Sequence, residues 1–72
     1  MSKVSDRLGL TLPLHIEFGS DAVQVIDSLG VTAAYIQLAD DPEYRQQTGR
    51  FSREQAAEIA NMIVQTLNDE FL

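Results

Sequence analysis

The sequence contains no cysteine, so neither a disulfide nor a thiolate metal site can stabilise the chain. Its 72 residues make one domain, close to the lower size at which a single hydrophobic core suffices. We therefore expect marginal stability that is raised by a homodimer or another partner protein. Lys3 and Arg7 are not followed by the apolar run of a signal peptide, and together with the missing cysteines this predicts a cytoplasmic location.

Basic residues are absent between Leu8 and Tyr44, whereas acids recur there, and the net charge of the chain is −6. Because phosphate backbones are bound by Lys and Arg, this charge distribution argues against direct nucleic-acid binding. No apolar run is long enough to cross a bilayer, and the C-terminal amphipathic segment carries acids where a membrane-surface helix has Lys and Arg. We expect no membrane contact.

Signatures of catalysis are also missing. His15 is the only histidine, so it has no second histidine with which to bind a metal, and alternation along its strand predicts that it is exposed. The chain has no phosphate-binding glycine loop and is too short to enclose a substrate alone. Asp40, Asp41 and Glu43 lack the spacing of a calcium loop, and helix capping explains them. We predict no enzyme, cofactor, metal site or small-molecule substrate.

The C-terminal third, residues 52–71, predicts one long amphipathic helix. Ser52 and Gln55 have the spacing of a capping box, and Phe51 is placed for a hydrophobic staple with Ala56. Apolar residues recur at steps of three and four on one side, and polar residues, Asn68 included, on the other. The apolar stripe consists of Ala56, Ile59, Ala60, Ile63, Leu67 and Phe71.

The preceding residues predict short elements. Residues 12–18 alternate like a half-buried strand, and Pro13 places that strand at a sheet edge or before its first turn. Residues 20–29 have the spacing of a short helix ended by Gly30, with a strand over 23–27 as the alternative. Residues 31–39 mix strand-forming and helix-forming residues, and we predict a strand with a helix as the alternative. Residues 42–47 favour a short helix with an acidic cap and Gly49 after its end.

These elements predict a small single α+β domain over residues 1–72, packed on its C-terminal helix, with a mostly all-α fold as the alternative. Residues 1–11 contain at most one helical turn over 5–9, and we expect them to be mobile.

The end of the long helix suggests a partner-binding surface. Leu67, Phe71 and Leu72 continue the apolar stripe to the last residue, although the acids there oppose the helix dipole. We predict that these three residues contact a partner or a second copy, with docking inside the domain beneath residues 12–18 as the rival, and that Arg45 and Arg50 add a positive feature. The first function expected is a non-catalytic interaction or regulatory module. An acidic decoy that inhibits a nucleic-acid-binding protein is the alternative, and a helix-turn-helix regulator is less favoured.

Overall fold

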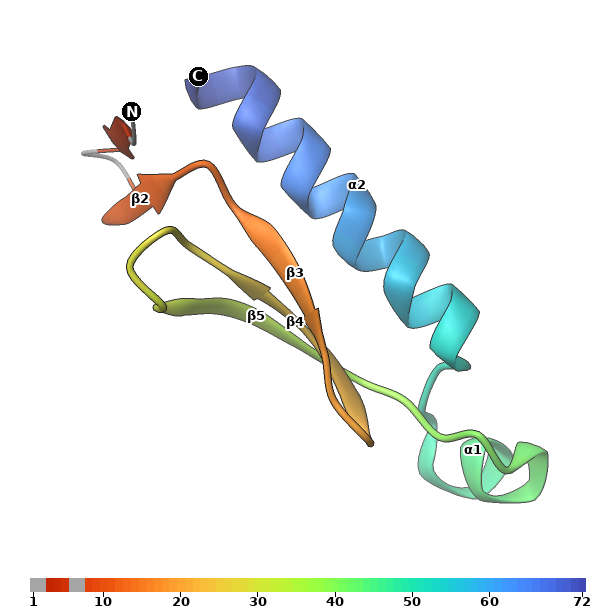
Figure 1. Cartoon of the computed structure of the whole chain (residues 1–72). Coiled ribbons are helices and arrows are strands. Elements are labelled where there is room, and N and C mark those ends of the chain that lie inside the picture. Colours follow the sequence, from red (N-terminus) through yellow and green to blue (C-terminus); the bar gives the residue numbers. More distant parts are fainter. Residues whose placement is uncertain (1–2, 6–7) are drawn as a thin grey trace.

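The fold is a two-layer α+β arrangement in which one long helix lies on a small antiparallel sheet (Figure 1). The computed structural model describes the backbone of residues 3–5 and 8–72, and side chains from residue 8 onward. The predicted fold class is confirmed.

The elements form a hairpin, a sheet and two helices. The hairpin pairs β1 (Lys3–Ser5) with β2 (Leu10–Leu12). The sheet has the strand order β3 (His15–Phe18), β4 (Ala22–Ile26), β5 (Thr32–Gln37), and the helices are α1 (Pro42–Thr48) and α2 (Arg53–Phe71).

The core lies between β4 and α2. Val23 and Val25, two residues apart on the central strand, are fully buried because side chains alternate across a sheet. Ala56 and Ala60, one helical turn apart, are buried opposite them, and their small side chains allow α2 to approach the sheet closely. Leu12, Leu14 and Leu38 complete this cluster.

The helix predicted over residues 20–29 is wrong, and the alternative strand is correct, since Ala22–Ile26 forms β4. Val25 and Ile26 fit the helical spacing as well as a strand, so the periodicity alone did not decide. The β-branched side chains of Val23 and Val25 pack on the pleated inner face of the sheet, and tertiary burial therefore outweighs local helix preference.

Residues 12–18 do not form one continuous strand. β2 ends at Leu12, the Leu12–Pro13 peptide is cis, and β3 begins only at His15. The predicted alternation holds only at the start of this segment, where Leu14 is buried and His15 is exposed. Phe18, which the alternation places on the buried side, is 60% exposed at the end of the edge strand. β3 also lies at a sheet edge, as Pro13 predicted.

The prediction for residues 1–11 falls partly on residues 1–2 and 6–7, which lie outside the described residues. Where the structure describes this segment, it contains strand rather than helix, because Lys3 pairs with Leu12 and Ser5 with Leu10. Gly9 adopts a left-handed conformation (φ 68°) in the turn before β2, a conformation that glycine accepts without a Cβ clash. Mobility of this segment stays a prediction.

Both helix starts follow the predicted caps. The Asp41 side chain accepts the Glu43 N–H at 3.0 Å, and Gly49 ends α1 with φ 70°. At α2, Ser52 Oγ accepts the Gln55 N–H while Gln55 Oε1 accepts the Ser52 N–H, each at 3.1 Å. The strand expected within residues 31–39 is confirmed as β5.

Asn68 fixes the far end of α2 to the chain just before β3, although the sequence placed it on the polar face. Its Oδ1 accepts the Leu14 N–H at 2.8 Å, and its Nδ2 donates to the Leu14 carbonyl oxygen at 3.3 Å. Replacing Asn68 with Ala leaves both groups of Leu14 without this partner. We expect the free energy of unfolding to fall by about 1–3 kcal/mol in urea titrations. Gln65→Ala, on the exposed side of α2, is the control and should stay within about 0.5 kcal/mol.

Candidate protein-binding surface

The apolar surface of α2 is broader than the face that the sheet covers. Met62 is 62% exposed and Phe51, just before the helix, is 44% exposed. Ile59, Ile63 and Leu67 are half-buried between these residues and the core. We call these five residues the apolar flank. Two shallow grooves follow it, one of about 380 Å³ along Met62, Ile63, Thr66 and Leu67, the other of about 280 Å³ along Phe51, Gln55, Glu58, Ile59 and Met62.

The apolar flank lies on the β5 side of the helix. Asn68 contacts Leu14, just before β3. Ile59 precedes Asn68 by nine residues, which is about two and a half helical turns. Ile59 therefore lies on the side of α2 opposite Asn68. Phe51 gives independent evidence, because its N–H donates to the Gln37 carbonyl at 3.3 Å and its carbonyl accepts the Ala39 N–H at 2.9 Å. Phe51 thus forms an isolated parallel bridge with Leu38, just past the end of β5.

The outer edge of β5 adjoins this flank and has no strand beside it in the described part of the chain. The Leu38 N–H donates to Asp21 next to β4, whereas the Gln37 carbonyl faces outward to Phe51. Backbone groups alternate along an antiparallel strand, so the N–H and C=O of Tyr35 also point outward. Natural edge strands are usually protected by charge or proline, and residues 32–39 contain neither.

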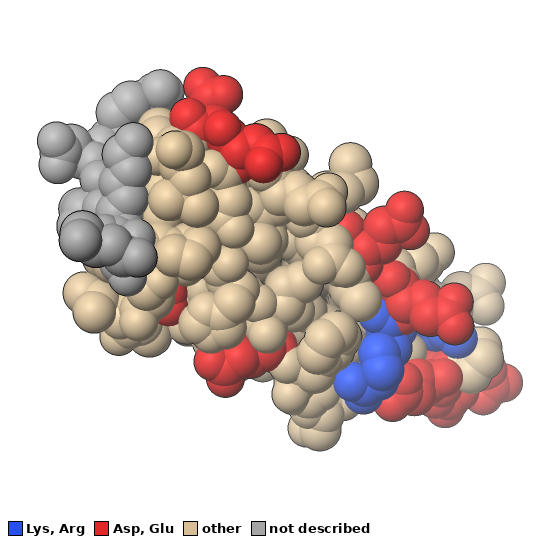
Figure 2. Space-filling model, turned by 45° about the horizontal axis from the view of Figure 1, so that its top comes forward, with Lys and Arg blue, Asp and Glu red and all other residues tan. Residues whose placement is uncertain are grey.

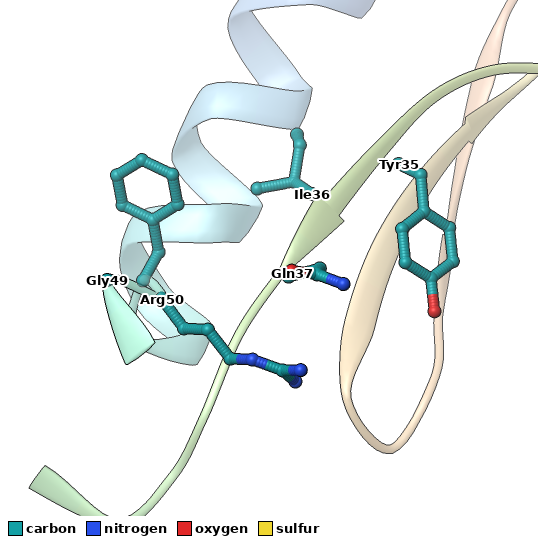
Figure 3. A pocket seen from close by; sticks show the side chains of 6 residues that line it. Tyr35, Ile36, Gln37, Gly49 and Arg50 are labelled. Atoms are coloured by element: carbon teal, nitrogen blue, oxygen red, sulfur yellow. The ribbon is translucent and has the colours of Figure 1, made fainter. Parts of the chain in front are cut away.

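A groove of about 410 Å³ lies at the end of this edge, lined by Tyr35, Ile36, Gln37, Gly49, Arg50 and Phe51. Figure 3 shows Ile36 directed toward the helix while Tyr35 lies on the other side of the strand. The groove therefore joins the outer face of the sheet to the apolar flank. An extended backbone can form hydrogen bonds here and contact apolar side chains at the same time.

The predicted residues at the end of α2 are only partly available to a partner. Leu67 and Phe71 are half-buried and pack against the domain's own core cluster. Leu72 is 58% exposed. A partner-binding role for these three residues stays a prediction, and Leu67 is the one that also belongs to the apolar flank. Sequence periodicity missed Met62 and Phe51 as the more exposed members of the same surface.

The two predicted arginines occupy different places. Arg50 lines the groove at the β5 edge, with its guanidinium 5.4 Å from the centre of the Tyr44 ring, a cation–π geometry. Arg45 is half-buried, and its Nε has no hydrogen-bond partner among the described residues. The hollow of about 290 Å³ beside it also contains Asp40 and Glu54, whose carboxylates oppose an anion. The structure therefore does not bring Arg45 and Arg50 together into one binding site.

Among the described residues, acidic side chains are spread along the visible face of the molecule, whereas basic ones gather at the α1 end (Figure 2). Arg53 Nη2 is 3.2 Å from Asp40 Oδ2, and its guanidinium also donates to the carbonyls of Gly19 and Ser20. His15 contacts Glu17 at 3.2 Å, with both side chains more than half exposed. These contacts join exposed groups and contribute little to stability.

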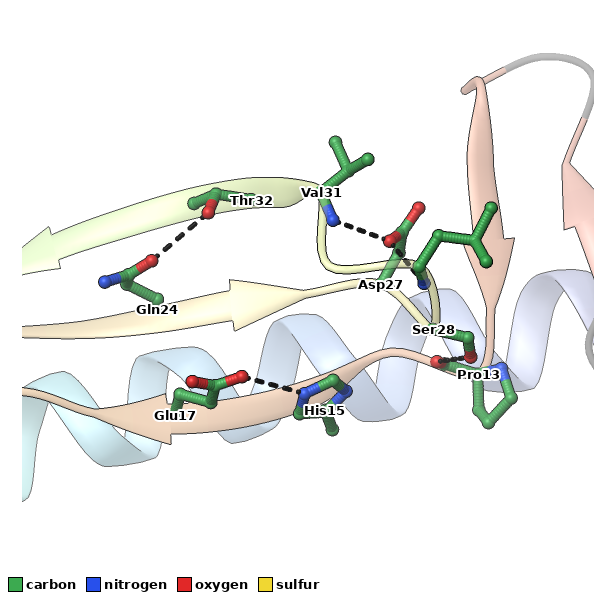
Figure 4. A network of polar contacts seen from close by, with 9 residues as sticks. Pro13, His15, Glu17, Gln24, Asp27, Ser28, Val31 and Thr32 are labelled. Atoms are coloured by element: carbon green, nitrogen blue, oxygen red, sulfur yellow. Dashed lines mark hydrogen bonds and ion pairs between the residues drawn. The ribbon is translucent and has the colours of Figure 1, made fainter.

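Asp27 is a fully buried acid that the sequence did not single out. Its Oδ2 accepts the Thr11 N–H at 3.0 Å. Its Oδ1 accepts the N–H groups of Leu29 at 2.9 Å and of Val31 at 2.8 Å, the latter drawn in Figure 4. The Thr11 N–H, followed by that of Val31, holds the pKa of Asp27 below its ordinary value of 3.8, although burial acts in the opposite direction. The run Asp27 to Gly30 between two strands was the available turn signal. This carboxylate ties the β4–β5 turn to β2 and is structural.

Across the described chain, no group of three or more His, Asp or Glu side chains is arranged to hold a metal ion. Neither α1 nor α2 combines the length and the apolar character that crossing a membrane requires. Comparisons with protein families, curated proteins and solved structures found no match to this chain.

Proposed function

We propose that this chain is a non-catalytic protein-interaction module whose binding surface is the apolar flank together with the outer edge of β5. The observation that carries the proposal is the position of Met62, a large apolar side chain 62% exposed in the middle of the only long helix described. Its neighbours Ile59, Ile63 and Leu67 extend the apolar surface in both directions. A contiguous apolar surface rimmed by polar residues is typical of protein-binding sites. We also propose a cytoplasmic location, supported by the cysteine-free sequence.

The acidic decoy is the second candidate, because Asp41 and Glu43 are exposed at the start of α1. Acidic side chains are prominent at that end of the molecule (Figure 2). Arg45, Arg50 and Arg53 interrupt that acidic surface, which weakens its resemblance to a row of phosphates. Salt separates the two candidates. A complex held by the apolar flank should persist in high salt, whereas a decoy complex should dissociate steeply as salt is added.

A pair of neighbouring substitutions tests the proposed surface. Met62→Lys places a charge in the apolar flank, whereas Asn61→Lys adds the same charge about 100° around α2, at an exposed position outside the flank. Both side chains are exposed, so each variant should keep its melting temperature. Quantitative pull-downs from the native host should lose bound protein, including native copies of this chain, with Met62→Lys and retain it with Asn61→Lys. Equal recovery with both variants would contradict the proposed surface.

A further inference from the structure

We infer that the groove at the end of β5 binds the C-terminal carboxylate of a partner protein, whose last residues add to the sheet as a strand parallel to β5. This inference rests on the proposed function, and it names the part of the partner that contacts the β5 edge. Two features of the described residues carry it: the backbone groups that face the groove, and an arginine at the end of the groove that has no carboxylate beside it.

The groove exists because the chain turns away from β5 just before Phe51. Phe51 forms a parallel bridge at the end of β5, at the position that a fourth strand would occupy. The two preceding residues do not continue that strand, because the N–H groups of Gly49 and Arg50 both donate to the Arg45 carbonyl, at 2.9 and 3.3 Å. Gly49 also has a φ of 70°, far from the φ of a strand. The fourth-strand position beside Ile36 is therefore open, and the groove of about 410 Å³ lies there.

Backbone groups along the groove match the end of a parallel strand. The Gln37 carbonyl faces outward, since it accepts the Phe51 N–H at 3.3 Å, so the Gln37 N–H and the Tyr35 carbonyl face the same way. A ligand residue beside Ile36 would donate its N–H to the Tyr35 carbonyl and accept the Gln37 N–H with its terminal carboxylate. Phe51 forms the same pattern two residues further along, because its carbonyl accepts the Ala39 N–H at 2.9 Å.

The charge of Arg50 determines which end of the ligand lies in the groove. Its guanidinium is 5.4 Å from the centre of the Tyr44 ring and forms no ion pair with any side chain that the structure describes. Figure 3 shows the Arg50 side chain extending toward the side of β5 on which Gln37 lies. The residues that line the groove include no acid. A strand parallel to β5 brings its terminal carboxylate to this guanidinium, whereas an antiparallel strand would bring a positively charged N-terminus.

The neighbouring side chains favour an apolar last residue in the ligand. Paired residues of a sheet direct their side chains to the same face, so the last side chain would lie beside Ile36, on the face that α2 covers. Phe51, which is 44% exposed, lines the same groove. A small carboxylic acid would reach Arg50 but leave the outward backbone groups of Tyr35 without a partner. The groove therefore fits the end of an extended chain better than a small acid.

NMR titrations of the ¹⁵N-labelled full chain with synthetic peptides test the inference. The probes are acetylated tetrapeptides that end in alanine, valine, leucine or phenylalanine, each made as the free acid and as the C-terminal amide. We expect the free acids to shift the signals of the Gln37 amide and the Arg50 Nε–H, and to bind at least about tenfold more tightly than the amides. Arg50→Gln should abolish this preference for the acid, and Arg50→Lys should retain part of it. Arg45→Gln removes the same charge outside the groove and should leave the preference intact.

Three results would contradict the inference. Free acids and amides that bind equally, or free acids that leave the Gln37 amide unshifted at about 10 mM peptide, would overturn carboxylate recognition. Isobutyrate, a carboxylate without a backbone to pair, should bind more weakly than the peptides, and equal affinity would overturn the parallel strand. The proposed function is judged separately, because it fails only if Met62→Lys and Asn61→Lys recover partner proteins equally.

Discussion

Ala60→Asp is expected to leave the chain largely unfolded at room temperature. Ala60 is fully buried where α2 crosses β4, in the same cluster as Val23 and Val25. A carboxylate there has no cation beside it, and burying an unpaired charge costs several kcal/mol. Small domains have a total stability near the lower end of about 5–15 kcal/mol, so one such group is enough to unfold the chain. Circular dichroism should show loss of the cooperative thermal transition.

The neighbouring residue gives the control for this experiment. Asn61 is exposed on the far side of α2, so Asn61→Asp adds the same charge without burying it. We expect its free energy of unfolding to remain within about 0.5 kcal/mol of the native value. If the two variants melted alike, the orientation of α2 on the sheet would be wrong.

Asp27→Asn is expected to give the second large loss of stability, although it changes only an oxygen to an amide. The Asn oxygen can still accept from Leu29 and Val31, but the amide nitrogen then faces the Thr11 N–H, so two donors meet. Thermal melts at neutral pH should show a markedly lower midpoint. Asp21→Asn, an exposed acid at the β3–β4 turn, should melt like the native chain.

The lowered pKa of Asp27 also predicts how the stability of the fold depends on pH. The pKa of Asp27 is lowered in the folded chain, so its carboxylate stabilises the fold at pH values above the ordinary 3.8. That stabilisation is lost as the pH falls through the lowered folded pKa. Asp27→Asn should therefore show a smaller loss of melting temperature than the native chain as pH is taken below 3.8. If the melting temperatures of the native chain and of Asp27→Asn fell by the same amount on acidification, this role for Asp27 would be contradicted.

Local signals in the sequence predicted the helices well. The capping box at Ser52 and the acid and proline before α1 act within a few residues, and the structure retains both. The fold class followed from the same signals. β4 was assigned incorrectly because Val25 and Ile26 satisfy two periodicities, and only burial against Ala56 and Ala60 decides between them.

The candidate surface could be predicted only in part. Periodicity identified the stripe that contains Ile63 and Leu67 and placed Met62 beside it, but it could not show that Met62 stays 62% exposed. Asn68 and Asp27 act through partners 54 and 16 residues away, contacts that no local pattern encodes. The free edge of β5 likewise follows from strand order, because the sheet happens to end beside the apolar flank.

Chemical-shift changes of the Met62 methyl group test the proposed surface most directly. The chain carries a ¹³C-labelled Met62 methyl group and is mixed with unlabelled protein from its native host. We predict that the Met62 methyl signal shifts or broadens when a partner binds, because the partner covers the apolar flank. A partner-bound chain whose Met62 methyl signal is unchanged would contradict the apolar flank as the binding surface.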